Sequence, residues 1–287
     1  NVAIGHNTID ANTTASNNVA IGKDALGAAT TGANNTAVGY GTLDALTTVS
    51  GITAIGYNAM TASTGALECV AVGAYALDAT TTGGYNTAVG YLALSANTTG
   101  SRNTAIGWGA NRLGTTGAHN TAIGDACMYQ NNVTGSGNTG VGRESLHYVI
   151  GSNNTAVGYQ AGFAVTTGVS TVAIGENAGD GVTTGNDNIC IGVQSGSSTT
   201  DLTTGSQNIL IGSLSHTSAA GSGYQYVIGY DAVGSGDDTA TFGHGATDST
   251  LSLGGTTWSA PSDIRYKEDI QDEVVGLNFI NELRPVT

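Results

Sequence analysis

Short apolar runs recur along the chain, and each ends in a glycine. Asn-Val-Ala-Ile-Gly at residues 1–5 returns at 18–22, and Asn-Thr-Ala-Val-Gly occupies 35–39 and 86–90. The first seven spacings between the closing glycines are 17 residues, and the later ones are 18, 16, 17, 17, 20, 17 and 14. This period predicts a repeat protein of about 15 units over residues 1–245. The marker glycines are Gly5, Gly22, Gly39, Gly56, Gly73, Gly90, Gly107, Gly124, Gly142, Gly158, Gly175, Gly192, Gly212, Gly229 and Gly243.

Each unit combines a β-type run with turn residues. In Thr-Ala-Val the two larger residues lie on one face of a strand and the small Ala on the other. Ala-Leu-x-Ala is either a second short strand or a turn, and Thr-Thr-Gly is typical of a turn. A single unit cannot bury its own apolar face, so the units must stack. The predicted fold class is therefore all-β, a repetitive β-roll or β-solenoid rod.

An asparagine begins many of the units. Its recurrence at one position predicts a ladder of amide side chains, which satisfy one another's hydrogen bonds along a stacked rod. The alanine at the third position of the unit suits a crowded place where a backbone or a neighbouring chain comes close. The recurring asparagines are Asn18, Asn35, Asn86, Asn103, Asn120, Asn154, Asn188 and Asn208.

The repeat stops near residue 246. Residues 246–261 break the pattern and predict a neck or cap, and residues 262–287 form a third region with a different composition. This last region is rich in charge, and Val274, Leu277 and Ile280 are spaced three apart, which predicts a short amphipathic helix.

Composition excludes several classes of protein. Glycine makes up 45 of the 287 residues without a three-residue period, so the chain is not collagen, and 10% charged residues are too few for an acidic disordered tail. The net charge is −14, and residues 1–260 contain only Lys23, Arg102, Arg112 and Arg143 as cations. Such a surface disfavours nucleic acid and anionic lipid, and no apolar run of 18 residues predicts insertion in a membrane.

The Val-Ala-Ile-Gly units resemble the head domains of trimeric autotransporter adhesins and, more closely, the repeat regions of bacteriophage tail-fibre proteins. The resemblance covers about residues 1–243. It implies a parallel β-roll assembled as a homotrimer. Because the chain begins at Asn1 and not at Met, we expect an upstream region that attaches such a fibre to the virion.

A second resemblance lies in residues 262–287. Ser-Asp-Ile-Arg-Tyr-Lys-Glu-Asp-Ile at 262–270, followed by Leu-Arg-Pro-Val at 283–286, is similar to the start of the C-terminal intramolecular chaperone of phage tail spikes and endosialidases. That family trimerises the fibre and then cleaves itself at a serine with a lysine five positions later. The resemblance implies that Ser262 and Lys267 act as nucleophile and base at the Pro261–Ser262 bond. The family domain continues well beyond this segment, and an ordinary junction with surface side chains is the alternative.

Aromatic residues just after the marker glycine are candidates for ligand binding. Either they form a stacking platform for the sugar rings of a surface glycan, or they form a ladder packed between layers or between chains. Successive units would place Tyr40 beside Tyr57 and Tyr91 beside Trp108. The other aromatics in this phase are Tyr159 and Tyr230.

The less regular units beyond Gly124 offer a second candidate surface. Tyr148 is part of it, and the other members are Arg143, Glu144, His147 and Phe163. A lateral binding surface made by these residues is a hypothesis that we keep beside the aromatic platform.

Other chemistries receive less support. The histidines and the three cysteines show no metal-ligand spacing, and no nucleotide loop is present, so we expect no metal and no cofactor. A depolymerase would need paired carboxylates along one groove, and Glu144, Glu176 and Asp180 are the weak candidates for that role.

These observations favour an extracellular fibre of a phage virion that binds a host surface polysaccharide. We expect no enzymatic activity beyond one self-cleavage at Ser262. A bacterial trimeric adhesin at the cell surface and a polysaccharide depolymerase are the alternatives.

Overall fold

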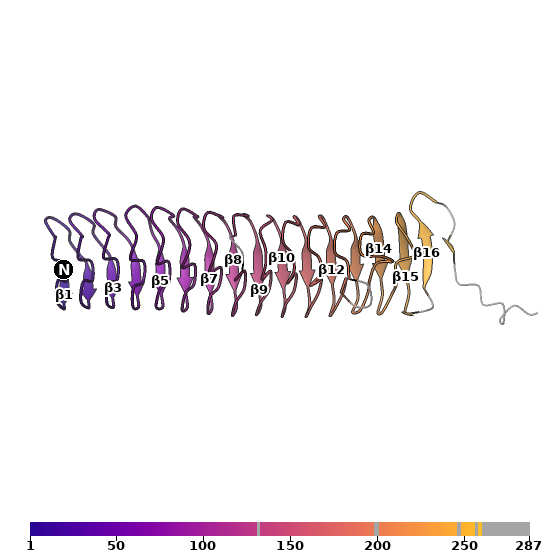
Figure 1. The fold of residues 1–287 in the computed structure, drawn as a ribbon, viewed down its shortest axis with the longest axis horizontal. Helices are drawn as coiled ribbons and strands as arrows, with labels where there is room; N and C mark the ends of the chain where they lie inside the picture. Colours follow the sequence, from indigo (N-terminus) through magenta and orange to yellow (C-terminus); the bar gives the residue numbers. More distant parts are fainter. Residues whose placement is uncertain (131–132, 198–200, 246–247, 256–257, 260–287) are drawn as a thin grey trace, which may run out of the picture.

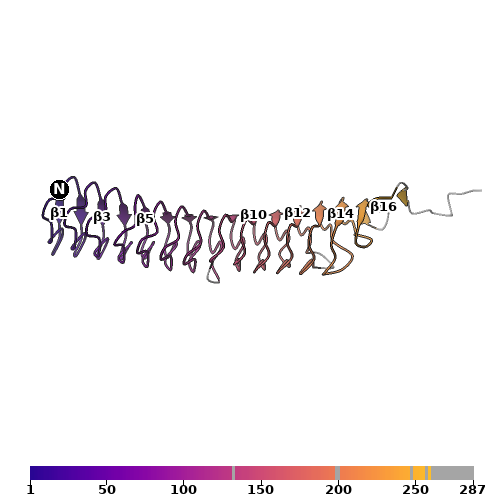
Figure 2. The ribbon, with the colours of Figure 1, turned by 90° about the horizontal axis from the view of Figure 1, so that it is seen from above.

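The computed structural model describes residues 1–130, 133–197, 201–245, 248–255 and 258–259, and within these residues it is all-β with no helix. The coils follow one another in single file along a rod, each strand beside that of the next coil (Figures 1 and 2). Ser262, Lys267 and the predicted C-terminal helix lie outside the described residues.

One short strand comes from each coil. Strands β1 to β15 pair in parallel with their neighbours in chain order and in matching register, so that Ala88 of β6 lies opposite Ala105 of β7. The predicted fold class is confirmed. The strands are β1 Val2–Ile4, β2 Val19–Ile21, β3 Thr36–Val38, β4 Thr53–Ile55, β5 Val70–Val72, β6 Thr87–Val89, β7 Thr104–Ile106, β8 Thr121–Ile123, β9 Thr139–Val141, β10 Thr155–Val157, β11 Val172–Ile174, β12 Ile189–Ile191, β13 Ile209–Ile211, β14 Gln225–Ile228, β15 Thr239–Phe242, β16 Ser249–Ser252 and β17 Trp258–Ser259.

Side chains alternate across each strand as the sequence predicts. In β7 the central Ala105 is fully buried, whereas Ile106 after it is 38% exposed. The core side of the sheet is therefore made mostly of alanines, with Gly140, Cys190, Leu210 and Val227 in later coils, and the outer side carries mostly β-branched residues. A small central side chain leaves room in the narrow coil for one larger apolar residue from the opposite turn.

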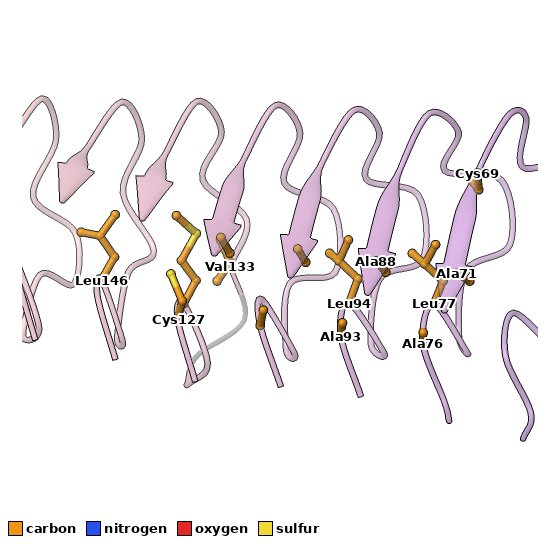
Figure 3. Packing of buried hydrophobic residues seen from close by; sticks show 14 of the residues in the cluster. Cys69, Ala71, Ala76, Leu77, Ala88, Ala93, Leu94, Cys127, Val133 and Leu146 are labelled. Carbon is orange, nitrogen blue, oxygen red and sulfur yellow. The ribbon is translucent and has the colours of Figure 1, made fainter. Parts of the chain in front are cut away.

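That larger residue comes from the Ala-Leu-x-Ala segment, which is a turn and not a second strand. Leu77 and Leu94 point into the core at equivalent places of successive coils (Figure 3), and both are fully buried. Their backbones adopt the left-handed conformation, with φ of 54° and 51°. This conformation costs a non-glycine residue roughly 1–2 kcal/mol. Burial of the side chain and the bond from Leu94 N to Ala110 O at 3.0 Å offset this cost.

The marker glycines are required where successive coils come closest. Gly90 has a φ of +141°, and a Cβ added there would lie 2.2 Å from the carbonyl oxygen of Gly107 in the next coil. Neither the backbone angle nor the space allows another residue. This explains why the glycine recurs in every unit.

The asparagines form a ladder, but its rungs join side chain to backbone. Asn103 N donates to Asn86 Oδ1 at 2.8 Å, and Asn120 N donates to Asn103 Oδ1 at 2.9 Å. The Asn103 amide also donates to Gly117 O at 2.8 Å. The buried amide of Asn103 thus satisfies two backbone groups of the next coil, an N–H and a carbonyl, and its own polar atoms find the partners that a buried polar side chain needs.

The parallel run ends after β15. Strand β16 pairs with β15 in the antiparallel direction, and β17 pairs with β16 likewise. One carboxylate oxygen of Asp248 accepts a hydrogen bond from Val233 N at 2.8 Å. The parallel stacking therefore stops where the sequence predicts a neck or cap, whose role stays a prediction.

Replacing Gly90 by alanine is expected to lower the free energy of unfolding by about 1–3 kcal/mol more than the same change at Gly236. Gly236 is a matched control because its φ is +144° and nothing lies within 4 Å of an added Cβ. Chemical denaturation of the two variants separates the cost of the clash from that of the backbone angle. Equal losses would contradict the role of close approach.

Replacing Asn103 by alanine is expected to lower the free energy of unfolding by about 1–3 kcal/mol, because Asn120 N–H then loses its acceptor inside the rod.

Replacing Cys69 by asparagine should have the opposite effect and raise the free energy of unfolding. Cys69 occupies the ladder position, and its Sγ lies 3.6 Å from Gly83 O, where an amide could donate. Thermal melts followed by circular dichroism compare both variants with the unmodified chain. A destabilised Cys69→Asn variant would show that the ladder does not control this position.

Candidate functional site

Within the described residues, aromatic rings of neighbouring coils meet in two runs and in one separate stacked pair, Tyr230 on His244 at 5.3 Å. The first run contains Tyr40, Tyr57, Tyr75 and Tyr91. Tyr40 and Tyr57 stack with ring centroids 5.3 Å apart and planes at 11°, as predicted. Tyr75 then meets Tyr57 and Tyr91 edge-on, at 5.4 Å and 6.2 Å.

The second run is denser, and we call it the Trp108 cluster: Trp108, Tyr129, His147, Tyr148 and Phe163. Trp108 stacks on Tyr129 at 5.2 Å, Tyr129 on His147 at 5.7 Å, and His147 on Phe163 at 5.0 Å. Each step crosses to the next coil. Tyr148 stands nearly perpendicular to this stack, at 78° to His147 and 86° to Phe163.

The cluster joins two positions of the repeat. Trp108 is the first residue after its marker glycine, whereas Tyr129, His147 and Phe163 are each the fifth. Alignment of equivalent positions in successive units predicted that Tyr91 would lie beside Trp108. Tyr91 instead contacts Tyr75 edge-on, and Trp108 stacks on Tyr129. Tyr129 and Tyr75 were therefore missed. For Tyr129 the signal was usable, because His147 and Phe163 occupy the same position in the next two units, whereas Tyr75 is the second residue after its marker glycine and shares that position with no ring in the adjacent units.

Stacking along the rod limits what these rings can offer to a ligand. The facing surfaces of Tyr40 and Tyr57 cover each other, and Lys23 lies 5.1 Å from the Tyr40 ring centroid. The rings of this pair thus present mainly edges and hydroxyl groups. Tyr40 and Tyr57 remain 44% and 48% exposed, so these atoms are accessible. The geometry favours the ladder for the first run, and a sugar platform there stays an untested prediction.

The basic side chains are tied to the same aromatic residues. Within the described part of the chain, all four Lys and Arg residues lie over a tyrosine of an adjacent coil, at 5.1 to 5.6 Å from the ring centroid. Arg112 also donates to the Tyr129 hydroxyl, and Arg143, over Tyr159, also contacts Asp125 and Glu144. The described surface therefore offers an anionic ligand no cluster of unengaged cations.

His147 lies inside the cluster as a neutral ring. It is only 8% exposed, and burial lowers the pKa of its imidazole. Its Nδ1–H donates to Ala126 O at 3.2 Å, which fixes that nitrogen as the protonated one. A neutral imidazole stacks between Tyr129 and Phe163 without adding charge to the cluster.

The three candidate carboxylates, Glu144, Glu176 and Asp180, do not form a pair of the kind that a depolymerase needs. Burial disfavours the charged form of Glu144, but hydrogen bonds from Gln160 and Arg143 outweigh it and lower the pKa of the carboxyl group. Burial raises the pKa of Asp180, and Glu176 is an exposed residue of the same coil. Among the residues that the structure describes, no hydrogen bond or ion pair joins any two of these three carboxylates, and a depolymerase role receives no positive support.

The described residues offer few groups for metal binding or redox chemistry. They contain no group of three His, Cys, Asp or Glu side chains placed to hold a metal ion. The three cysteines are buried free thiols, and burial raises the pKa of Cys127 and Cys190 to about 12. In the portions of the chain that the structure covers, no helix has the length and apolar character needed to cross a bilayer.

Comparison with known proteins gives no family assignment, because no protein-family model, curated protein or solved structure matches the chain.

Replacing His147 by phenylalanine is expected to flatten the pH dependence of stability below pH 7. Unfolded histidine binds a proton near pH 6.5, whereas burial keeps the folded His147 neutral to lower pH. Protonation therefore favours the unfolded chain, and this contribution to stability is lost as the pH falls from 7 through 6.5 toward the folded pKa. Denaturation at pH 7.5, 6.5 and 5.5 measures the slope. The exposed His119, changed to phenylalanine, is the control, and identical slopes in both variants would contradict the assignment.

Proposed function

We propose that the chain is the shaft of a homotrimeric fibre that attaches a virion to a host surface glycan. The observation that supports association of several copies is an outer stripe on the sheet. The third residue of every strand from β1 to β13, and the last of β14 and β15, is Val, Ile or Phe pointing away from the core. The stripe comprises Ile4, Ile21, Val38, Ile55, Val72, Val89, Ile106, Ile123, Val141, Val157, Ile174, Ile191, Ile211, Ile228 and Phe242.

This stripe is unusual for an isolated chain. Its residues are about a third or more exposed in many coils, for example 39% at Ile55 and 38% at Val157. Parallel sheets are normally covered on both faces, and monomers rarely leave long apolar patches open. The column beside it, led by Val2 and Val19, is also β-branched in nearly every coil. The outer face of the sheet therefore favours a protein partner.

A second copy of the chain is the occupant that fits best. It offers a stripe of the same length and the same coil spacing, so that rows of side chains can interlock over the whole rod. Closed cyclic assembly satisfies every copy in the same way. The choice of three copies rests on the resemblance to trimeric fibre and adhesin repeats.

The virion and glycan parts of the proposal have separate support. The resemblance of residues 262–287 to the tail-spike chaperone favours a phage fibre over a bacterial adhesin. Self-cleavage at Ser262 with Lys267 belongs to the same proposal. Repeated coils in a trimer would present many weak contacts to a polysaccharide and bind it through avidity.

The purified chain is expected to have a native mass three times 28.5 kDa. Ile123→Glu should convert it to a folded monomer, since a charge would be buried between copies. Leu113→Glu is the matched control, because Leu113 is also 36% exposed but lies outside the stripe. Light scattering coupled to gel filtration measures the three masses. A monomeric unmodified chain would overturn the trimeric fibre.

A further inference from the structure

The Trp108 cluster occupies positions that the fold does not require to be aromatic. In earlier coils the fifth residue after the marker glycine is Asp44, Thr61, Asp78 or Ser95, and these coils stack in the same register. The sixth residue is alanine in all four. The rings at these two positions are therefore an addition to a rod that already forms without them.

Tyr148 differs from the rest of the cluster in orientation. The other rings stack from coil to coil, so their planes lie across the rod. Tyr148, at 78° and 86° to two of them, has a plane that runs along the rod. A sugar ring of an extended glycan lying along the fibre can stack on a ring of that orientation.

Two polar residues, Tyr129 and Gln130, lie in the coil before Tyr148. The Tyr129 hydroxyl accepts from Arg112, and it retains its own proton for donation to a ligand. The exposed Gln130 is held beside the cluster because its N–H donates to His147 O at 2.9 Å. Hydroxyl and amide groups of this kind suit the hydroxyl groups of a pyranose.

The charges near the cluster select against anions. Asp125 and Glu144 lie in two of its coils, and the nearby cations are engaged, Arg112 with Tyr129 and Arg143 with both carboxylates. The whole chain carries a net charge of −14. An anionic polysaccharide would be repelled at long range and would meet no unengaged cation there.

We propose that the Trp108 cluster binds an uncharged pyranose chain, with Tyr148 as its stacking ring. This inference rests on the proposed glycan-binding function and deepens it, since it names the site and the class of glycan.

Replacing Tyr148 by alanine is expected to weaken binding of uncharged glycans about tenfold or more, because the stacking ring is removed. The probes are immobilised oligosaccharides of glucose, galactose, mannose, rhamnose and N-acetylhexosamines, with uronic and sialic acid oligosaccharides as anionic probes. Tyr148→Phe keeps the ring and should bind within about threefold of the unmodified chain. Tyr224→Ala is the control, since Tyr224 is 50% exposed and lies in a distant coil. Melting temperatures of all variants exclude unfolding as the cause.

Several outcomes would overturn the inference. Binding of anionic probes alone would refute the class of glycan, and equal binding by Tyr148→Ala would refute the site. Adsorption to bacteria that survives periodate oxidation of their glycans would indicate a protein receptor in place of a sugar. If bacteria are bound through periodate-sensitive glycans but Tyr148→Ala adsorbs normally, the site fails while the fibre proposal stands. If neither cells nor glycans are bound, both proposals fail.

Discussion

The spacing between paired parallel strands, about 4.8 Å, is the constraint on which the rest of the molecule depends. Because the coils pair in register, the nearest neighbour of most side chains is the residue at the same position one coil away. The same residue type can recur in successive coils only where two such residues can lie side by side at that distance. Glycine does so at the closest backbone approach, as Gly90 and Gly107 show. Asparagine does so by hydrogen bonding, and tyrosine by stacking, as in Tyr40 on Tyr57.

Much of this could be predicted from the sequence, because position within the unit determines which residues become neighbours. The strands, the inward alanines and the asparagine ladder all follow from the period and from alternation along a strand. The backbone conformation of the turns could not be predicted in this way, because the repeat period carries no information about φ. Leu94 adopts a left-handed conformation that leucine disfavours, and its buried side chain and its hydrogen bond to the next coil explain it. The Trp108–Tyr129 stack was missed for a related reason, because it joins two different positions of neighbouring units and depends on the shape of the turn.

The small size of the coil links folding to assembly. In most coils the core consists of an alanine from the strand, further alanines and one or two larger apolar side chains such as Leu43 or Met60, so each layer buries little apolar surface of its own. Stacking of the coils buries more apolar surface, but it cannot cover the outer face of the sheet. In strands β1 to β13 that face carries a full column of Ile and Val beside a column of Thr, Val and Ile, where a freely exposed sheet would carry mainly polar residues. The central side chain of each strand thus serves the core, and the flanking ones form the face on which the proposed second copy would pack.

Departures from the repeat are informative because the regular units define what the fold needs. The unit length changes to 18 and then 16 residues between Gly124 and Gly158, and rings fill the fifth position in the coils that begin at Gly124, Gly142 and Gly158. A stacked ladder stabilises itself, so the row from Trp108 to Phe163 alone does not imply a ligand. Tyr148 crosses the row instead of extending it. The ladder requirement does not account for the orientation of that ring, and this is why the proposed glycan is placed on Tyr148.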